Sequence, residues 1–199
     1  MKKIAISSLL AFVMSVSLNA NNSGGWFIGG ELGMMSVGVY EERAPENAIL
    51  KDEDSYDAFN AAIKFGKYGN NSRVYGFYEN QGEEDSSFDN STANTFGVGY
   101  DYLFINSTKI VPFVGVQAMY MSVNIDGSNL APSGPGLGVG FGFIYPITNN
   151  IEIEAGYRVV SLGVIDSAEW MPEICEHPNE HKVGLKDYTQ SYIGLNYKF

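Results

Sequence analysis

Residues 136–145 read Gly-Leu-Gly-Val-Gly-Phe-Gly-Phe-Ile-Tyr, and this stretch decides the fold class. Every second position from Leu137 to Tyr145 is a large apolar residue, and the positions between them are glycine up to Gly142. Successive side chains of a β-strand point to opposite faces, so period-two alternation predicts a strand. Residues 136–145 therefore predict a strand with one apolar face and one face of small residues.

The same alternation recurs along the chain. The sequence predicts eight strands, at about 25–40, 55–67, 73–81, 93–104, 110–122, 136–146, 150–163 and 188–199. In each of them one face carries no charged side chain. The opposite faces carry nine charged residues: Glu31, Lys64, Arg73, Glu79, Asp101, Glu152, Glu154, Arg158 and Lys198. An all-β antiparallel up-and-down barrel of eight strands is the architecture that this pattern indicates.

Alternation alone does not say which face is buried. A lipocalin-like soluble barrel would hold its apolar face inside, around a ligand. A transmembrane barrel does the opposite, with apolar side chains toward lipid and polar ones toward the lumen. The connections favour the membrane version. Short turns near 68–72, 105–109 and 147–149 alternate with long connections near 41–54, 82–92, 123–135 and 164–187, as periplasmic turns and external loops do.

Glycine and aromatic residues support the same orientation. Glycine crowds the charged faces, as expected inside an eight-stranded barrel, whose interior is only wide enough for side chains to fill. Aromatic residues stand near the ends of the apolar faces, where a membrane barrel has its interfacial girdles. The end that holds both termini would carry Trp26, Tyr102, Phe104, Tyr145, Tyr197 and Phe199; the loop end would carry Phe96, Tyr120 and Tyr78.

Four stretches resemble the small outer-membrane β-barrel family, the OmpA-like, OmpX-like and opacity-type proteins. They are Gly25–Gly30 (GWFIGG), Pro112–Gly115 (PFVG), Glu154–Arg158 (EAGYR) and Ile193–Phe199 (IGLNYKF). The resemblance implies an integral outer-membrane protein of a Gram-negative bacterium. It also implies that Ile193, Leu195, Tyr197 and Phe199 form the signal read by the barrel assembly machinery. The chain ends at this signal, so we expect no periplasmic peptidoglycan-binding domain.

The N-terminal segment, residues 1–20, has the order of a secretory signal peptide. Lys2 and Lys3 precede an apolar stretch from Ile4 to Leu18, and Ala20 supplies a small residue at the cleavage position. A short buried or anchoring helix is the alternative. The barrel domain would then be residues 21–199, in which no apolar run reaches the roughly 20 residues of a membrane-spanning helix.

Composition excludes several classes of protein. The 199-residue chain has 12 basic and 23 acidic residues and a formal net charge of -11, which argues against a nucleic-acid partner. Its single cysteine rules out an internal disulfide framework and a four-cysteine zinc site.

The nine inward charges can be interpreted in two ways. Five acids and four bases are close to balance, so ion pairs and hydrogen bonds would plug the lumen. Arg158 would be the centre of this network, because its forked donors can serve two carboxylates at once. The functional alternative is a narrow ion-conducting path lined by the same groups.

The long connections carry most of the acid. The first holds Glu41, Glu42, Glu46, Asp52, Glu53, Asp54 and Asp57, and the second holds Glu83, Glu84, Asp85 and Asp89. Solvation of the external end accounts for these charges, and binding of Mg²⁺ or Ca²⁺ beside lipopolysaccharide is the alternative. Cys175, His177 and His181 in the fourth connection are candidate ligands for a transition metal, with an ordinary exposed loop as the alternative.

The sequence offers no catalytic residues and no cofactor site. Both histidines lie in the fourth connection, and neither forms the His-x-Ser arrangement expected from resemblance to lipid A deacylases. We therefore expect a non-catalytic, monomeric barrel that supports outer-membrane integrity and presents acidic loops for adhesion or environmental contact. The alternatives are a narrow porin-like channel and a lipid-A-modifying enzyme. The expected partners are outer-membrane lipid and lipopolysaccharide, the assembly machinery and a host or surface ligand.

Overall fold

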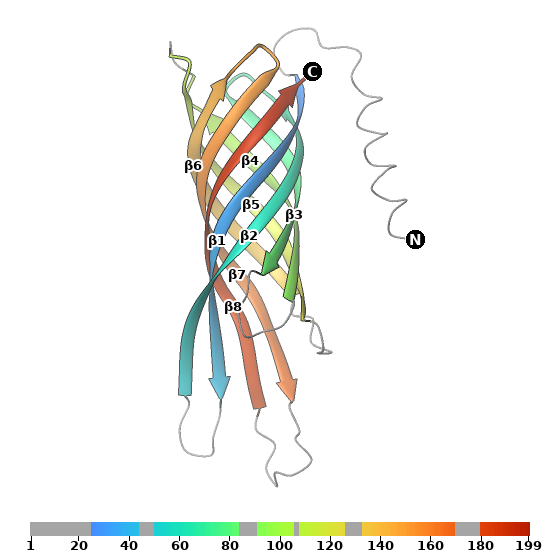
Figure 1. Cartoon of the computed structure of the whole chain (residues 1–199), viewed down its shortest axis with the longest axis vertical. Helices are drawn as coiled ribbons and strands as arrows, with labels where there is room; N and C mark the ends of the chain where they lie inside the picture. Colours follow the sequence, from blue (N-terminus) through green and yellow to red (C-terminus); the bar gives the residue numbers. More distant parts are fainter. Residues whose placement is uncertain (1–24, 44–49, 84–90, 106–107, 126–132, 170–179) are drawn as a thin grey trace, which may run out of the picture.

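The computed structural model describes residues 25–43, 50–83, 91–105, 108–125, 133–169 and 180–199. These residues form eight antiparallel strands (Figure 1). The strands are β1 (Trp26–Arg43), β2 (Leu50–Tyr68), β3 (Ser72–Glu83), β4 (Ser91–Leu103), β5 (Val111–Ile125), β6 (Ser133–Pro146), β7 (Ile151–Glu169) and β8 (Glu180–Lys198). All eight predicted strands are confirmed. No helix among the described residues is long and apolar enough to cross a membrane.

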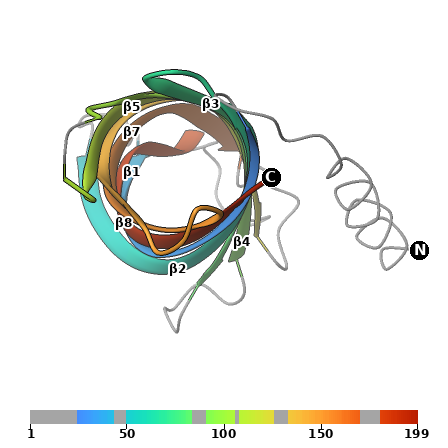
Figure 2. The same cartoon turned by 90° about the horizontal axis from the view of Figure 1, so that it is seen from above.

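Each strand pairs with the next one along the chain, and β8 pairs back onto β1 to close the barrel. The closing ladder begins at Phe27 opposite Lys198, and at the same end the N–H of Phe199 donates to the carbonyl of Trp26 at 2.9 Å. Figure 2 shows the resulting ring of strands from above. The up-and-down barrel topology predicted from the alternation is confirmed.

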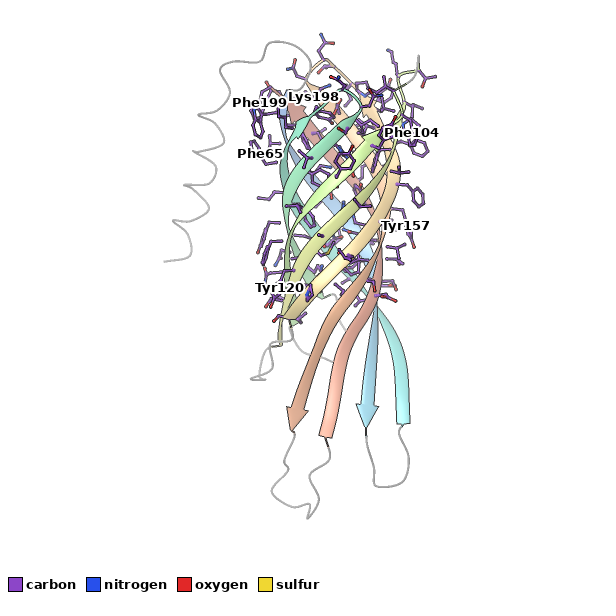
Figure 3. All side chains as sticks on the ribbon, turned by 180° about the vertical axis from the view of Figure 1, so that it is seen from behind. Phe65, Phe104, Tyr120, Tyr157, Lys198 and Phe199 are labelled. Carbon is purple, nitrogen blue, oxygen red and sulfur yellow. The ribbon has the colours of Figure 1, made fainter. Side chains whose placement is uncertain are left out.

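The outer wall is apolar, as the sequence predicts. Along β6, for example, Leu137, Val139, Phe141 and Phe143 are all more than half exposed, while the glycines between them face inward. Aromatic side chains lie near both ends of the wall. Phe65, Phe104 and Phe199 lie toward the end that holds the C-terminus, and Tyr120 lies toward the other end (Figure 3). An apolar wall with aromatic rims is the surface that a bilayer solvates.

The lumen also contains apolar side chains that were not predicted. One cluster packs Leu103, Phe113, Ile144 and Tyr192 toward the terminus end. A larger cluster runs from Phe27 to the loop end. Its members there include Met35, Val37, Met119, Met121, Val123, Val160, Leu162 and Tyr188. The alternation predicts correctly that these positions face inward, but our prediction emphasised their charged and glycine neighbours.

Four strands are longer at the loop end than the sequence predicts. β1 continues to Arg43, β2 begins at Leu50, β7 continues to Glu169 and β8 begins at Glu180. These four project beyond the level at which β3 to β6 end (Figure 1). In the sequence of these extensions the apolar alternation fades, although the backbone ladder continues. The predicted connections 41–54 and 164–187 are therefore largely strand.

Candidate functional site: the charged lumen

The nine charged residues of the lumen come from six strands. Glu31 is on β1, Lys64 on β2, Arg73 and Glu79 on β3, Asp101 on β4, and the remaining four on β7 and β8. Each stands at an inward position, which alternates along the strand with the outward-facing residues of the wall. All of them except Lys198 are buried.

Glu154 is the centre of this network. The guanidinium of Arg73 donates from Nη1 to Oε2 and from Nη2 to Oε1 of Glu154, both at 2.7 Å. Lys64 Nζ donates to Oε2 at 2.7 Å. Tyr192 Oη and Asn196 Nδ2 add hydrogen bonds, both at 2.9 Å. Five donors thus satisfy one carboxylate, which is the condition under which a buried charge is tolerated.

Arg158, which the sequence suggested as the centre, links two other carboxylates. Its Nη2 donates to Glu31 Oε2 at 2.6 Å, and its Nη1 lies 3.6 Å from Glu79 Oε2. Its guanidinium carbon also lies 4.0 Å from the centroid of the Tyr192 ring. Arg158 thus serves two carboxylates as expected, but the greater number of contacts belongs to Arg73 and Glu154.

The remaining charges extend the network on either side of Glu154. Lys64 links Glu154 to Glu31, because its Nζ also donates to Glu31 Oε1 at 2.6 Å. Arg73 Nε donates to Asp101 Oδ2 at 2.7 Å. At the terminus end, Lys198 pairs with Glu152 at 2.7 Å while 30% of the Lys198 side chain is exposed. Among the described side chains of the lumen, each of the nine charges has an opposite charge within ion-pair distance.

The predicted charge network did not include a layer of neutral polar residues that lies beside the ion pairs. Gln81 and Gln190 donate to Glu79 at 2.9 and 3.0 Å, and Gln117 donates to the hydroxyl of Tyr75 at 2.9 Å. Asn60 is fully buried, and neither of its amide atoms has a partner among the described residues. The sequence signal for this layer is the period-two alternation. Asn60 lies four positions before Lys64 and Gln81 two positions after Glu79, so each faces inward like the charged residue of its own strand.

Two glycines show why small residues are required beside these groups. A Cβ on Gly115 would collide with the carboxylate of Asp101, and a Cβ on Gly99 would collide with the ring of Tyr75. Both glycines lie opposite a large inward side chain of the neighbouring strand. Glycine at these positions leaves room for Asp101 and Tyr75 inside a narrow barrel.

The paired charges of the lumen hold the strands of the barrel together. Donors and acceptors of opposite charge face each other in a space that water hardly reaches, so the interactions are strong and their partners are not free to bind a substrate. Among the described residues, no group of three or more His, Cys, Asp and Glu side chains is placed to hold a metal ion. Cys175 and His177 lie outside the described residues, and His181 is described only by its place in β8. The predicted signal peptide 1–20 also lies outside them, as do the side chains of most of the loop acids.

The proposed assembly residues occupy one face of the last strand. Ile193, Leu195 and Tyr197 are exposed on the outer wall, and Phe199 follows at its rim. The Phe199 ring stacks on Phe65 and on Tyr197, with centroids 6.4 Å apart in each case. These residues are thus accessible from lipid at the seam where β8 meets β1.

The model of the outer membrane protein beta-barrel domain matches residues 5–199. The chain belongs to this family. Proteins of the outer membrane protein beta-barrel family reside in the outer membrane, and this is the location of the chain. No curated protein matches it by sequence.

Solved outer-membrane barrels share the fold of this family member. Neisserial surface protein A matches with a TM-score of 0.62 and 19% identity, over 89% of this chain and 100% of that one. OprG from Pseudomonas aeruginosa matches with a TM-score of 0.66 and 14% identity, over 90% and 98%. OprH from P. aeruginosa matches with a TM-score of 0.55 and 22% identity, over 88% and 99%. At these identities the likeness concerns the fold.

Proposed function

We propose that this protein is a non-catalytic barrel that supports outer-membrane integrity and presents acidic segments at the cell surface. The single observation that carries the proposal is the filled lumen. Glu154, Arg73 and Glu31 are buried and mutually paired, and apolar clusters lie on both sides of the ion pairs. A barrel filled in this way has a rigid interior and leaves contact with other molecules to its wall and its external end.

The same observation argues against the narrow channel. A conducting path requires water-accessible groups, whereas Met121, Val37 and Tyr188 at the loop end are no more than 2% exposed. An eight-stranded barrel also has little bore to spare once side chains fill it. We therefore expect no steady single-channel current from the purified protein in planar lipid, and discrete, reproducible openings would favour the channel instead.

The arrangement also argues against a lipid-A-modifying enzyme. General acid–base chemistry needs a group with a free lone pair or proton near the substrate. The buried carboxylates are instead held by cations and amides inside the wall. Incubation of the protein with lipopolysaccharide, followed by mass analysis of lipid A, should show no change in acyl chains or phosphates.

The integrity role is tested in cells that lack the gene. We expect deletion to raise the uptake of a hydrophobic fluorescent probe, N-phenylnaphthylamine, and complementation with the intact chain to restore the barrier. A variant in which acids of the second connection are neutralised, E84Q/D85N/D89N, should restore the barrier as well, because the wall and lumen are unchanged. An unaltered barrier in the deletion strain would overturn this part of the proposal.

A further inference from the structure

A groove interrupts the apolar outer wall near the terminus end of the barrel. It has a volume of about 410 Å³ and is lined by Ile110, Phe143, Tyr145, Ile153 and Ala155. Ala155 accounts for the depression, because it is paired with Phe143 of β6 on one side and with Ile193 of β8 on the other. A single methyl group between two large side chains leaves space that an acyl chain can fill.

A second groove lies toward the loop end of the wall and has a volume of about 390 Å³. Ala118 lines it together with Phe96 and Tyr120. The hydroxyl of Tyr120 donates to Ser133 at 3.0 Å. The rim group that the structure describes here is therefore neutral and already hydrogen-bonded, so it offers little to a charged lipid headgroup.

The terminus end differs, because its exposed charged side chains are all basic in the part of the chain that the structure describes. Lys67 and Lys109 are exposed and Lys198 is partly exposed, whereas Asp101 and Glu152 at the same end are buried. Neither Lys67 nor Lys109 has a described carboxylate within ion-pair distance. These two lysines are therefore available to an external anion.

Lys109 is the lysine that adjoins the groove, because it directly precedes Ile110. Tyr145 lines the same groove with 45% of its surface exposed, and its hydroxyl makes no hydrogen bond to any described residue. An ammonium group and a free hydroxyl beside an apolar groove match the phosphate and the acyl chain of a phospholipid. The connections at this end are the short ones, which lie on the periplasmic side of an outer-membrane barrel. Lipopolysaccharide occupies the opposite leaflet.

We propose that the wall at the terminus end binds one anionic phospholipid of the periplasmic leaflet, with its phosphate at Lys109 and one acyl chain in the groove over Ala155. Acyl chains solvate the rest of the wall as well, so the groove contributes shape, through dispersion contacts with the bound chain. The basic rim supplies the preference for an anionic headgroup. Binding at this site needs only the membrane location of the barrel and is independent of the integrity role.

The charge is tested with the purified full chain in mixed micelles of phosphatidylglycerol and phosphatidylcholine. Native mass spectrometry counts the lipid molecules that stay bound, and we expect one phosphatidylglycerol to be retained in preference to phosphatidylcholine. Lys109→Gln should weaken this binding about five-fold, since a basic residue at the membrane surface contributes about that factor. Lys67→Gln is the matched control. It removes a cation from the same end, where Lys67 lies over the ring of Trp26, and should bind as the parent does.

The groove is tested by filling it. Ala155→Leu should weaken retention of phosphatidylglycerol about two-fold, the equivalent of a few lost dispersion contacts, while Ala118→Leu in the second groove should leave it unchanged. Methyl NMR in nanodiscs then locates the lipid. A phosphatidylglycerol with a nitroxide near the headgroup end of one acyl chain should broaden the Ala155 methyl signal more than that of Ala118. A phosphatidylcholine with the same label should broaden both alike.

The substituted positions are exposed, so each variant should keep the closed barrel, which heat-dependent gel mobility checks. Equal retention of the two lipids, an equal loss in both lysine variants, or equal broadening of both methyl signals by labelled phosphatidylglycerol would overturn the proposal. So would unchanged binding in Ala155→Leu, or a dimer of the chain joined through this face in cross-linking. None of these measurements depends on the barrier assay, so failure of the lipid site and failure of the integrity role are distinguishable.

Discussion

Arg73 and Glu154 form a two-point ion pair across the lumen, from β3 to β7, with both N–O distances at 2.7 Å. The planar fork of an arginine matches the two oxygens of a carboxylate, so this geometry fixes both side chains. The pair joins strands on opposite parts of the ring that share no backbone ladder. It therefore braces the barrel across its interior.

Glu154→Gln should destabilise the barrel strongly. The variant keeps the shape of the side chain but leaves Arg73 and Lys64 without their shared anion, and breaking a buried pair typically costs about 3–5 kcal/mol. Glu152→Gln is the matched control, because its partner Lys198 is partly exposed and the loss should be about 1 kcal/mol or less. Denaturant unfolding in lipid vesicles measures both. Equal losses would mean that water reaches Glu154.

Val139→Arg should cost about 2–4 kcal/mol if the residue lies near the bilayer midplane, because it places a charge on the lipid-facing wall. Val139 is 60% exposed on that wall. Gly140→Arg, at the next position, should also destabilise the barrel, but for a different reason. A Cβ there already lies 3.4 Å from that of Arg158, so a second guanidinium would crowd the lumen.

The control for the wall position is Val139→Leu. Its free energy of unfolding in lipid vesicles should lie within about 1 kcal/mol of that of the parent. Heat-dependent gel mobility reports whether each variant still closes. Unchanged stability of Val139→Arg in lipid would show that this face does not contact acyl chains.

Gly99→Ala should displace the ring of Tyr75 and cost about 1–3 kcal/mol, as overpacking does in a filled interior. Gly76→Ala is its counterpart on the outer wall, where the nearest atom to a new Cβ is 3.8 Å away. That change should be neutral or stabilise by about 0.5–1 kcal/mol, because glycine weakens a strand. The amide signal of Gln117, the partner of Tyr75, should move in the first variant by NMR and stay in place in the second.

Phe199→Ala tests the proposed assembly signal. We expect a lower level of the protein in the outer membrane, measured by quantitative blotting of membrane fractions. Phe65→Ala removes the ring that stacks on Phe199 but leaves the C-terminal pattern intact. Both variants should lose similar stability in vesicles, and only Phe199→Ala should assemble poorly in cells. A parallel loss of assembly in Phe65→Ala would assign the effect to the aromatic rim instead.

The sequence predicts the wall of this barrel better than its interior. Alternation identifies all eight strands and the inward side of each, because one face must be compatible with lipid along its whole length. It does not show how far each inward residue lies along the barrel axis, which depends on the stagger between strands. For this reason Arg158 was predicted as the centre of the network in place of Glu154, and the contact between Arg73 and Glu154 was not foreseen.

The loop ends of the strands were predicted less well for a related reason. Outside the bilayer both faces of a strand can be wet, so residues such as Glu41, Glu42 and Arg43 occur in succession without ending the ladder. The apolar residues of the lumen were overlooked because Met35 and Val37 follow the charged position Glu31 on the same face. An inward face can change from charged to apolar along one strand while its period stays at two.

The ladder between β1 and β8 has a consequence for biogenesis. It joins the first strand to the last, Phe27 to Lys198, so the ring cannot close until β8 has been translated and exported. A product truncated before β8 would leave backbone groups of β1 and β7 without partners in hydrocarbon, where each costs several kcal/mol. Shortened versions should therefore be removed by quality control, and insertion should be an all-or-none event.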